Sequence, residues 1–197
     1  MTVRPEDEAP PAPLPTEPSP WTTLATRLIY TNTWMTVRED RVLRPDGREG
    51  IYGVMEARPA TGVVALTDQL EVWLVGQWRY PTGNYSWEII EGGADPGELP
   101  EEAARRELLE EAGLSARDWE LLGGEVHLSN CITAERAWIY LARGLALESA
   151  PTPEATERLQ LRRVPLVEAL RRIDSGEIVD AVSVIGLLRA ARRLGVG

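Results

Sequence analysis

The sequence predicts an α/β protein built on a mixed β-sheet, with helices on both faces and a small antiparallel sheet at its N-terminal side. Two observations predict this class. Strand-like apolar runs are interleaved with helix-like segments, but without the regular strand–helix repeat of a purely parallel protein. The chain has 197 residues, 43% of them hydrophobic, which is enough to bury one core with small additions.

The first third of the chain is expected to contain a tail and the small sheet. Residues 1–21 are rich in Pro and Glu and lack the apolar central segment of a signal peptide, so we expect an extended or disordered tail. Residues 22–58 are expected to form the small sheet, because residues 26–56 alternate loosely between apolar and polar types and Pro-Asp-Gly at 45–47 predicts a turn between two strands. Residues 59–197 are expected to form the main domain.

The middle of the chain predicts three strands, a glycine-rich loop and a helix. Residues 63–66 and 72–78 are apolar runs separated by a turn-like Thr-Asp-Gln, and residues 85–90 form another short run. The loop Glu-Gly-Gly-Ala-Asp-Pro-Gly follows at 91–97. Pro100 then fits the first turn of a helix, and Gly113 fits the position just past its end.

The last third predicts two strands and two helices. Residues 119–128 and 136–145 are the strand candidates, and the polar loop 129–135 joins them. Residues 165–176 are expected to hold a short helix that Gly176 ends. Asp180 is placed to cap a final helix over 181–194, with Gly195 beyond it.

Charge and cysteine content limit the partners and the compartment. The formal net charge is −10, which argues against a nucleic-acid partner because such a surface is normally basic. All 21 basic residues are Arg, since the chain contains no Lys. Cys131 is the single cysteine, so no intrachain disulfide forms and a cytoplasmic location is expected. No apolar run approaches the ~20 residues that span a bilayer, so no membrane partner is expected.

The predicted helix after the glycine-rich loop is unusually acidic. Ala104, Leu108 and Ala112 lie on one face and are expected to pack inward. Three carboxylates share the side next to that face: Glu107, Glu110 and Glu111. Hard oxygen donors at this spacing suit Mg²⁺ or Mn²⁺. The spacing alone also fits a solvated helix face, and both interpretations stay open at this level.

The wider pattern around these glutamates resembles a known motif. Gly92 is followed by five residues and Glu98, then by seven residues and Arg-Glu-Leu-Leu-Glu-Glu-Ala-Gly-Leu at 106–114. This resembles the Nudix box of the Nudix hydrolases at every defined position. The resemblance implies an α/β/α sandwich around a mixed sheet, and hydrolysis of a nucleoside diphosphate linked to another group with a divalent metal as cofactor.

The same resemblance implies roles for the residues of the box. Glu107 and Glu111 would be the main metal ligands, and Glu110 would assist them. Arg106 would orient these acids through a salt bridge, without binding the metal itself. The backbone carbonyl of Glu91 would complete the metal shell. Mg²⁺ (or Mn²⁺) is the expected ion.

Further segments look like the ADP-ribose pyrophosphatase branch of this family. Arg79 matches a position that binds the substrate diphosphate. Glu88 could line the metal side of the substrate pocket or satisfy a neighbouring Arg. Glu135 matches a loop glutamate that acts as catalytic base or extra metal ligand. Asn130 stands near a position where the branch carries Pro, and Glu91 stands where Ala is common. The branch resemblance also implies that the N-terminal sheet builds a homodimer.

The expected reaction is hydrolysis of ADP-ribose to AMP and ribose 5-phosphate. Another nucleotide sugar, such as GDP-mannose, is the first alternative. A Nudix domain that senses a nucleotide without turning it over is the second, and the complete carboxylate set argues against it. A diphosphate isomerase on the same scaffold would need a reactive Cys–Glu pair, and the acidic loop here is interpreted otherwise.

Overall fold

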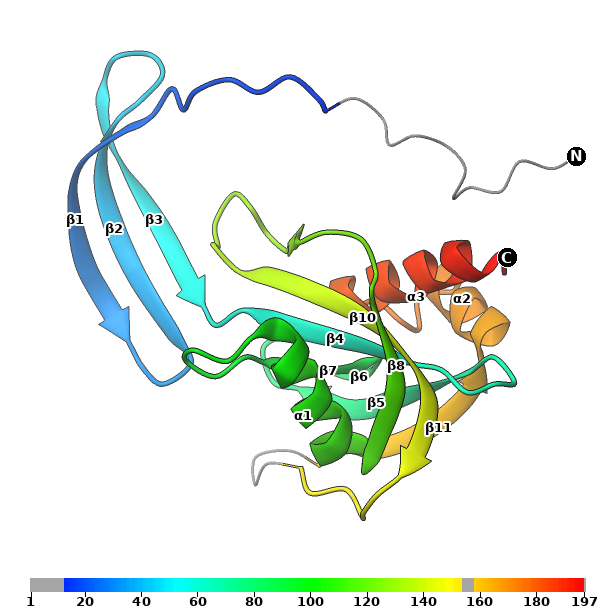
Figure 1. The fold of residues 1–197 in the computed structure, drawn as a ribbon. Coiled ribbons are helices and arrows are strands. Elements are labelled where there is room, and N and C mark those ends of the chain that lie inside the picture. The colour runs from blue at the N-terminus through cyan, green and yellow to red at the C-terminus, as the bar shows by residue number, and fades with distance from the viewer. Residues whose placement is uncertain (1–12, 154–157, 197) are drawn as a thin grey trace, which may run out of the picture.

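The computed structural model describes residues 13–153 and 158–196 of the protein (Figure 1). Residues 1–12 of the expected tail lie outside these ranges. Residues 13–21 belong to no strand or helix and are exposed. No helix in the described ranges is long and apolar enough to cross a membrane.

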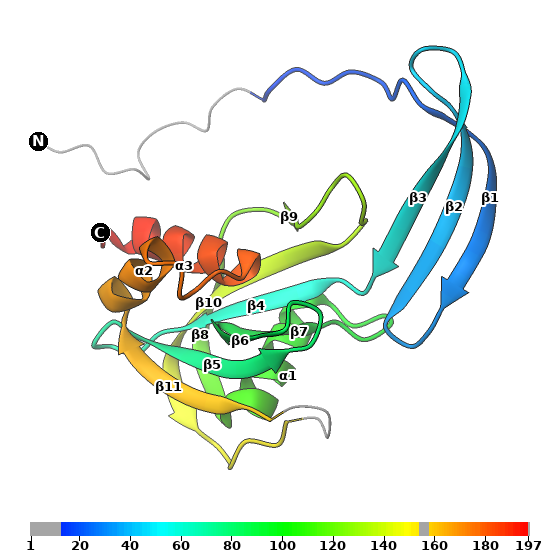
Figure 2. The ribbon, with the colours of Figure 1, turned by 180° about the vertical axis from the view of Figure 1, so that it is seen from behind.

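A three-stranded antiparallel sheet, in the order β1-β2-β3, stands to one side of the molecule (Figures 1 and 2). Its strands are β1 (Thr22–Thr31), β2 (Met35–Leu43) and β3 (Glu49–Ala57). The expected turn at 45–47 joins β2 to β3, and Gly47 takes the positive φ of 78° that it requires. The turn between β1 and β2 was not anticipated. It forms because Asn32 Oδ1 accepts hydrogen bonds from the backbone N–H groups of Trp34 and Met35, both at 2.8 Å.

The central sheet is mixed, as the sequence predicts. Its order is β7-β4-β10-β8, and the short β9 (Val126–His127) pairs with β10 outside this path. The strands β4 (Ala60–Ala65) and β10 (Arg136–Leu147) are parallel, whereas β7 (Ile90–Gly93) and β8 (Leu114–Leu121) pair antiparallel with their neighbours. A second, antiparallel sheet has the order β11-β5-β6, made of β11 (Gln160–Pro165), β5 (Glu71–Arg79) and β6 (Asn84–Glu88).

Helices cover both faces of the central sheet (Figure 1). Alternate residues of a strand face opposite sides. On β4, Val63 and Ala65 pack with α1 (Pro100–Ala112), while Val64 and Leu66 beyond its end belong to the cluster of α2 (Leu166–Asp174) and α3 (Ala181–Leu194). The residues of β10 divide in the same way. The predicted α/β/α sandwich is therefore confirmed, and its two cores lie on either side of the sheet.

The helix boundaries follow the local signals. Pro100 begins α1, and Gly113 ends it in the left-handed conformation with φ 67°. Asp180 caps α3 because its Oδ2 accepts the Ser183 N–H at 2.8 Å, and Gly195 closes that helix. Ala104, Leu108 and Ala112 are buried, as the helical spacing predicts.

The strand expected over residues 119–128 is wrong. The observed β8 begins at Leu114, directly after the glycine cap of α1, and ends at Leu121. Gly123, with φ 77°, then turns the chain before β9. The apolar run Trp119–Leu122 suggested a later start for this strand. Pairing with β10, rather than local composition, sets where β8 begins. Strand β11 was also missed, since its Arg-rich sequence lacks a strand pattern.

Candidate active site

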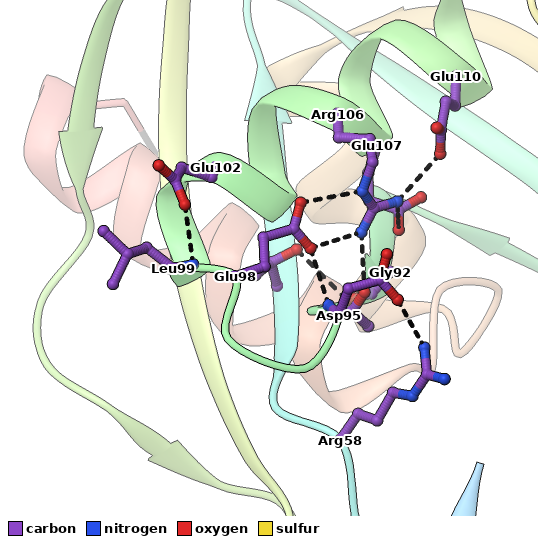
Figure 3. Close-up of polar contacts among 11 residues, drawn as sticks. Arg58, Gly92, Asp95, Glu98, Leu99, Glu102, Arg106, Glu107 and Glu110 are labelled. Atoms are coloured by element: carbon purple, nitrogen blue, oxygen red, sulfur yellow. Dashed lines mark hydrogen bonds and ion pairs between the residues drawn. The ribbon is translucent and has the colours of Figure 1, made fainter. Parts of the chain in front are cut away.

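The guanidinium of Arg106 lies at the centre of a network that joins α1 to the glycine-rich loop (Figure 3). Its Nε and Nη2 donate to the two carboxylate oxygens of Glu98, each at 3.0 Å, and Nη2 also donates to the carbonyl of Gly93 at 2.9 Å. Glu98 in turn accepts the backbone N–H of Asp95 at 2.8 Å. The ion pair with Arg106 holds the pKa of Glu98 below its usual value of 4.5. The loop conformation is thereby fixed to the first turns of the helix.

Arg106 also brings two of the expected metal ligands together. Its Nη1 donates to Glu107 Oε1 at 2.7 Å and to Glu110 Oε2 at 3.0 Å (Figure 3). Glu102, four residues before Arg106 on the helix, is used differently. Glu102 instead accepts the backbone N–H of Leu99 at 3.1 Å and so completes the start of the helix.

Glu111 and Glu107 both lie against the short strand β7. Glu111 is only 2% exposed, and its Oε2 accepts the backbone N–H of Glu91 at 3.2 Å. The carboxylate of Glu107 occupies the space beside Gly92: a Cβ built on Gly92 would come within 2.0 Å of Glu107 Oε1. Gly92 is therefore required for close approach, rather than for an unusual φ.

The donor chemistry of this cluster fits a divalent metal ion, because carboxylate and carbonyl oxygens are the ligands that Mg²⁺ and Mn²⁺ prefer. In their present conformations, no three Asp, Glu, His or Cys side chains of the described residues are grouped closely enough to hold an ion. The reason lies in the contacts above. Arg106 engages Glu107 and Glu110, while Glu111 bonds to the backbone. The expected ligands Glu107, Glu110 and Glu111 are thus held by other groups in this conformation.

Arg79 and Glu88 form an ion pair at the edge of the second sheet. Glu88 is 2% exposed and accepts hydrogen bonds from Arg79 Nε at 3.0 Å and from Arg79 Nη2. Gln77 Nε2 lies 3.4 Å from the same carboxylate. Glu88 thus contacts a neighbouring Arg and also lines the pocket beside it, so neither of the two roles considered for it is excluded. The side chain of Arg79 stays 40% exposed and lines a pocket of about 330 Å³ together with Asp180.

The side chain of Glu91 has a role that the sequence did not reveal. Ser183 Oγ donates to Glu91 Oε1 at 2.7 Å, which ties β7 to α3. Burial, and then the negative charge of Asp180, raise the pKa of Glu91 well above 4.5. The sequence identified Asp180 only as a helix cap. Its effect on Glu91 depends on α3 packing beside β7, and no local signal could have shown it.

Glu135 lies at the end of the loop 129–135, next to the start of β10. It is partly buried and lines a second pocket, of about 420 Å³, together with Asn130. Burial raises the pKa of Glu135, and the charge of Asp180 adds to this effect. Asp180 therefore acts electrostatically on both Glu91 of β7 and Glu135 of the loop 129–135.

Comparison with known proteins identifies the domains to which these elements belong. The NUDIX domain matches residues 56–182, and the nucleoside diphosphate sugar hydrolase N-terminal domain matches residues 21–55. An ADP-ribose pyrophosphatase of Mycobacterium tuberculosis is 32% identical over 168 residues, covering 84% of this chain and 81% of the relative. A CMP-5'-(N-acetyl-N-hydroxy-3-aminopropyl)phosphonate hydrolase of Streptomyces rubellomurinus is 29% identical, covering 90% of this chain and 84% of the relative.

A solved structure described as an ADP compounds hydrolase superposes with a TM-score of 0.79 at 25% identity, covering 92% of this chain and 97% of that one. The glutamate-rich helix, its glycine loop and the arginine network thus lie within the matched domain. The chain belongs to the Nudix hydrolase family and is a pyrophosphohydrolase of the ADP-ribose pyrophosphatase type.

Proposed function

We propose that this protein hydrolyses ADP-ribose to AMP and ribose 5-phosphate with Mg²⁺ or Mn²⁺ as cofactor. The observation that carries the proposal is the position of Glu107 and Glu111, whose carboxylates both lie against the backbone of β7 at Glu91 and Gly92. Nudix hydrolases generally use a divalent metal, and these oxygens, with Glu110 and the carbonyl of Glu91, are the donors proposed to hold it.

The metal is proposed to have two effects, one on the charge of the substrate and one on the acidity of water. When bound, it neutralises diphosphate oxygens and lowers the pKa of a coordinated water. Arg106 orients Glu107 and Glu110 through its hydrogen bonds to both carboxylates. Because Arg106 already carries contacts to Glu98 and Gly93, it keeps this orientation when one carboxylate moves.

The proposed proton acceptor is Glu135. A general base works best when its pKa is close to the working pH, and burial raises the pKa of this carboxyl above 4.5. Arg79 is proposed to bind the diphosphate. Its ion pair with Glu88 fixes one side of the guanidinium, and the exposed part remains available to an anion.

The residues 22–58 are proposed to form a dimerisation unit, and residues 59–197 the hydrolase domain. Every residue of β1 is exposed, including large apolar ones such as Leu28 (59%), and Trp34 in the following turn is 65% exposed. Contiguous exposed apolar residues favour a protein interface. Light scattering across a range of protein concentrations tests for the homodimer. A cytoplasmic location completes the proposal, and cell fractionation tests it.

The central experiment measures AMP release from ADP-ribose with Mg²⁺ or Mn²⁺, beside GDP-mannose and a CMP-linked phosphonate. The phosphonate is included because of the similarity to the Streptomyces rubellomurinus protein. Glu107→Gln should abolish turnover. Glu101→Gln is the matched control, because Glu101 lies on the same helix but is half exposed and pairs with Arg105.

Each outcome of this experiment has a definite meaning. Preferred turnover of ADP-ribose that is lost only in Glu107→Gln supports the proposal. Preference for GDP-mannose or the CMP compound would change the proposed substrate but leave the proposed metal site unchanged. Full activity of Glu107→Gln would contradict the metal assignment. Metal-dependent nucleotide binding without turnover of any compound would favour the sensor.

A further inference from the structure

The loop that carries Glu135 is attached to the small N-terminal sheet. Two backbone hydrogen bonds make the attachment at Met55 of β3. The Met55 N–H donates to the carbonyl of Ile132 at 3.0 Å, and the Ala134 N–H donates to the carbonyl of Met55 at 2.9 Å. Ala134 directly precedes Glu135, so the backbone at Glu135 is restrained through its neighbour.

A third hydrogen bond in this attachment comes from a side chain. The hydroxyl of Tyr52, also on β3, donates to the carbonyl of Cys131 at 2.8 Å. The ring of Tyr52 is supported in turn by Trp21, whose ring contacts it edge-to-face with the centroids 5.4 Å apart. Backbone bonds at Met55 form with any residue there except proline, which has no N–H, whereas the contact at Cys131 depends on a tyrosine at position 52.

The loop has internal bonds that transmit this restraint. The N–H groups of Ile132 and Thr133 both donate to the carbonyl of Ser129 at 3.0 Å, and the Glu135 N–H donates to Thr133 Oγ1 at 2.7 Å. Cys131 lies inside this turn. Fixing its carbonyl from outside therefore limits the movement of the whole turn, and with it the position of Glu135.

We propose that Tyr52 is a positioning residue, which holds the 129–135 loop on β3 so that Glu135 is kept in place for proton transfer. The inference rests on the proposed function through the role of Glu135. A residue of the N-terminal sheet, outside the Nudix box, thereby acts on the proposed base from within the same chain.

The test replaces the hydroxyl alone, in Tyr52→Phe. Backbone hydrogen exchange of residues 129–135 is expected to quicken about two- to tenfold, the effect of one lost hydrogen bond on local opening. For ADP-ribose, kcat should fall by a similar factor with KM unchanged, because the substrate diphosphate binds elsewhere. Tyr30→Phe is the matched control: Tyr30 is on β1 of the same sheet, and its hydroxyl contacts Asn32 at 3.3 Å rather than the loop.

A double-mutant cycle separates positioning from general destabilisation. If Tyr52 acts through Glu135, then Tyr52→Phe should lower kcat in the wild-type background and have no effect in Glu135→Gln. An equal loss in both backgrounds would overturn the proposal, as would faster exchange spread over all of β1–β3 instead of the loop.

The exchange measurement also keeps this inference separate from the proposed function. If the wild-type protein does not hydrolyse ADP-ribose, the proposed substrate fails, but exchange in residues 129–135 still shows whether Tyr52 holds the loop. If exchange and kcat in Tyr52→Phe both match those of Tyr30→Phe, the positioning role is refuted whatever the substrate is.

Discussion

Replacing Gly92 with Ala should disable the proposed metal site with little effect on the fold. A Cβ at position 92 would lie 2.0 Å from both Cδ and Oε1 of Glu107 and 2.5 Å from its Cγ. Ordinary contact begins at 3.4 Å, so the carboxylate must move by more than 1 Å. A displacement of about 1 Å at a reacting centre costs roughly 100-fold in rate, and we expect a loss of kcat of about that size for Gly92→Ala.

The fold should tolerate this substitution for two reasons. Gly92 does not have a positive φ, so Ala brings no backbone strain. The obstructing atoms belong to the end of a flexible side chain, and Ala also lowers the entropy of the unfolded chain. The midpoint of thermal unfolding should therefore shift by no more than about 4 °C, the change that corresponds to roughly 1 kcal/mol for a chain of this size.

Gly93→Ala provides the matched control. Its Cβ would lie 3.7 Å from Arg58 Cβ, an ordinary contact, and far from the carboxylate of Glu107. Both variants should be assayed for AMP release from ADP-ribose at saturating Mg²⁺ and for thermal unfolding. A Gly92→Ala protein that is as active as Gly93→Ala would refute the reasoning, and an unfolded Gly92→Ala protein would refute the claim that only the carboxylate moves.

Three further predictions concern charge. A chelator should abolish turnover, and added Mg²⁺ or Mn²⁺ should restore it in the wild type but not in Glu107→Gln; turnover without metal would contradict the assignment. The pKa of Glu98 is lowered by Arg106, so Glu98 stabilises the fold above pH 4.5 and loses this effect as the pH falls through its folded pKa. The wild type should therefore unfold at a higher temperature than Glu98→Gln at pH 7, and the gap should close below pH 4.5; a constant gap would exclude the ion pair as its cause. Arg79→Ala should raise KM for ADP-ribose. It should also destabilise the fold by about 2 kcal/mol in urea titrations, because Glu88 would stay buried without its charged partner; the partial exposure of Arg79 keeps this loss below that of a fully buried ion pair. An unchanged KM would limit Arg79 to its structural role.

Features of the fold that depend on local sequence were predictable. Pro100 and Gly113 mark the ends of α1, and Asp180 marks the start of α3, because capping and positive φ depend on residues within one turn. Strand boundaries were less accessible. The start of β8 at Leu114 depends on pairing with β10, a partner distant in the sequence, and the same is true of β11 against β5.

The features of the candidate site likewise depend either on local sequence or on distant parts of the fold. The sequence by itself determined the spacing of Glu107, Glu110 and Glu111, and hence the donor chemistry and the family, because one helix turn fixes which side chains are neighbours. Only the tertiary structure decided that Arg106 binds Glu98 across the loop, and that burial and then the charge of Asp180 raise the pKa of Glu91 and Glu135. Charges interact through space, so the pKa of a carboxyl depends on the elements that the fold packs against it as well as on its neighbours in the chain.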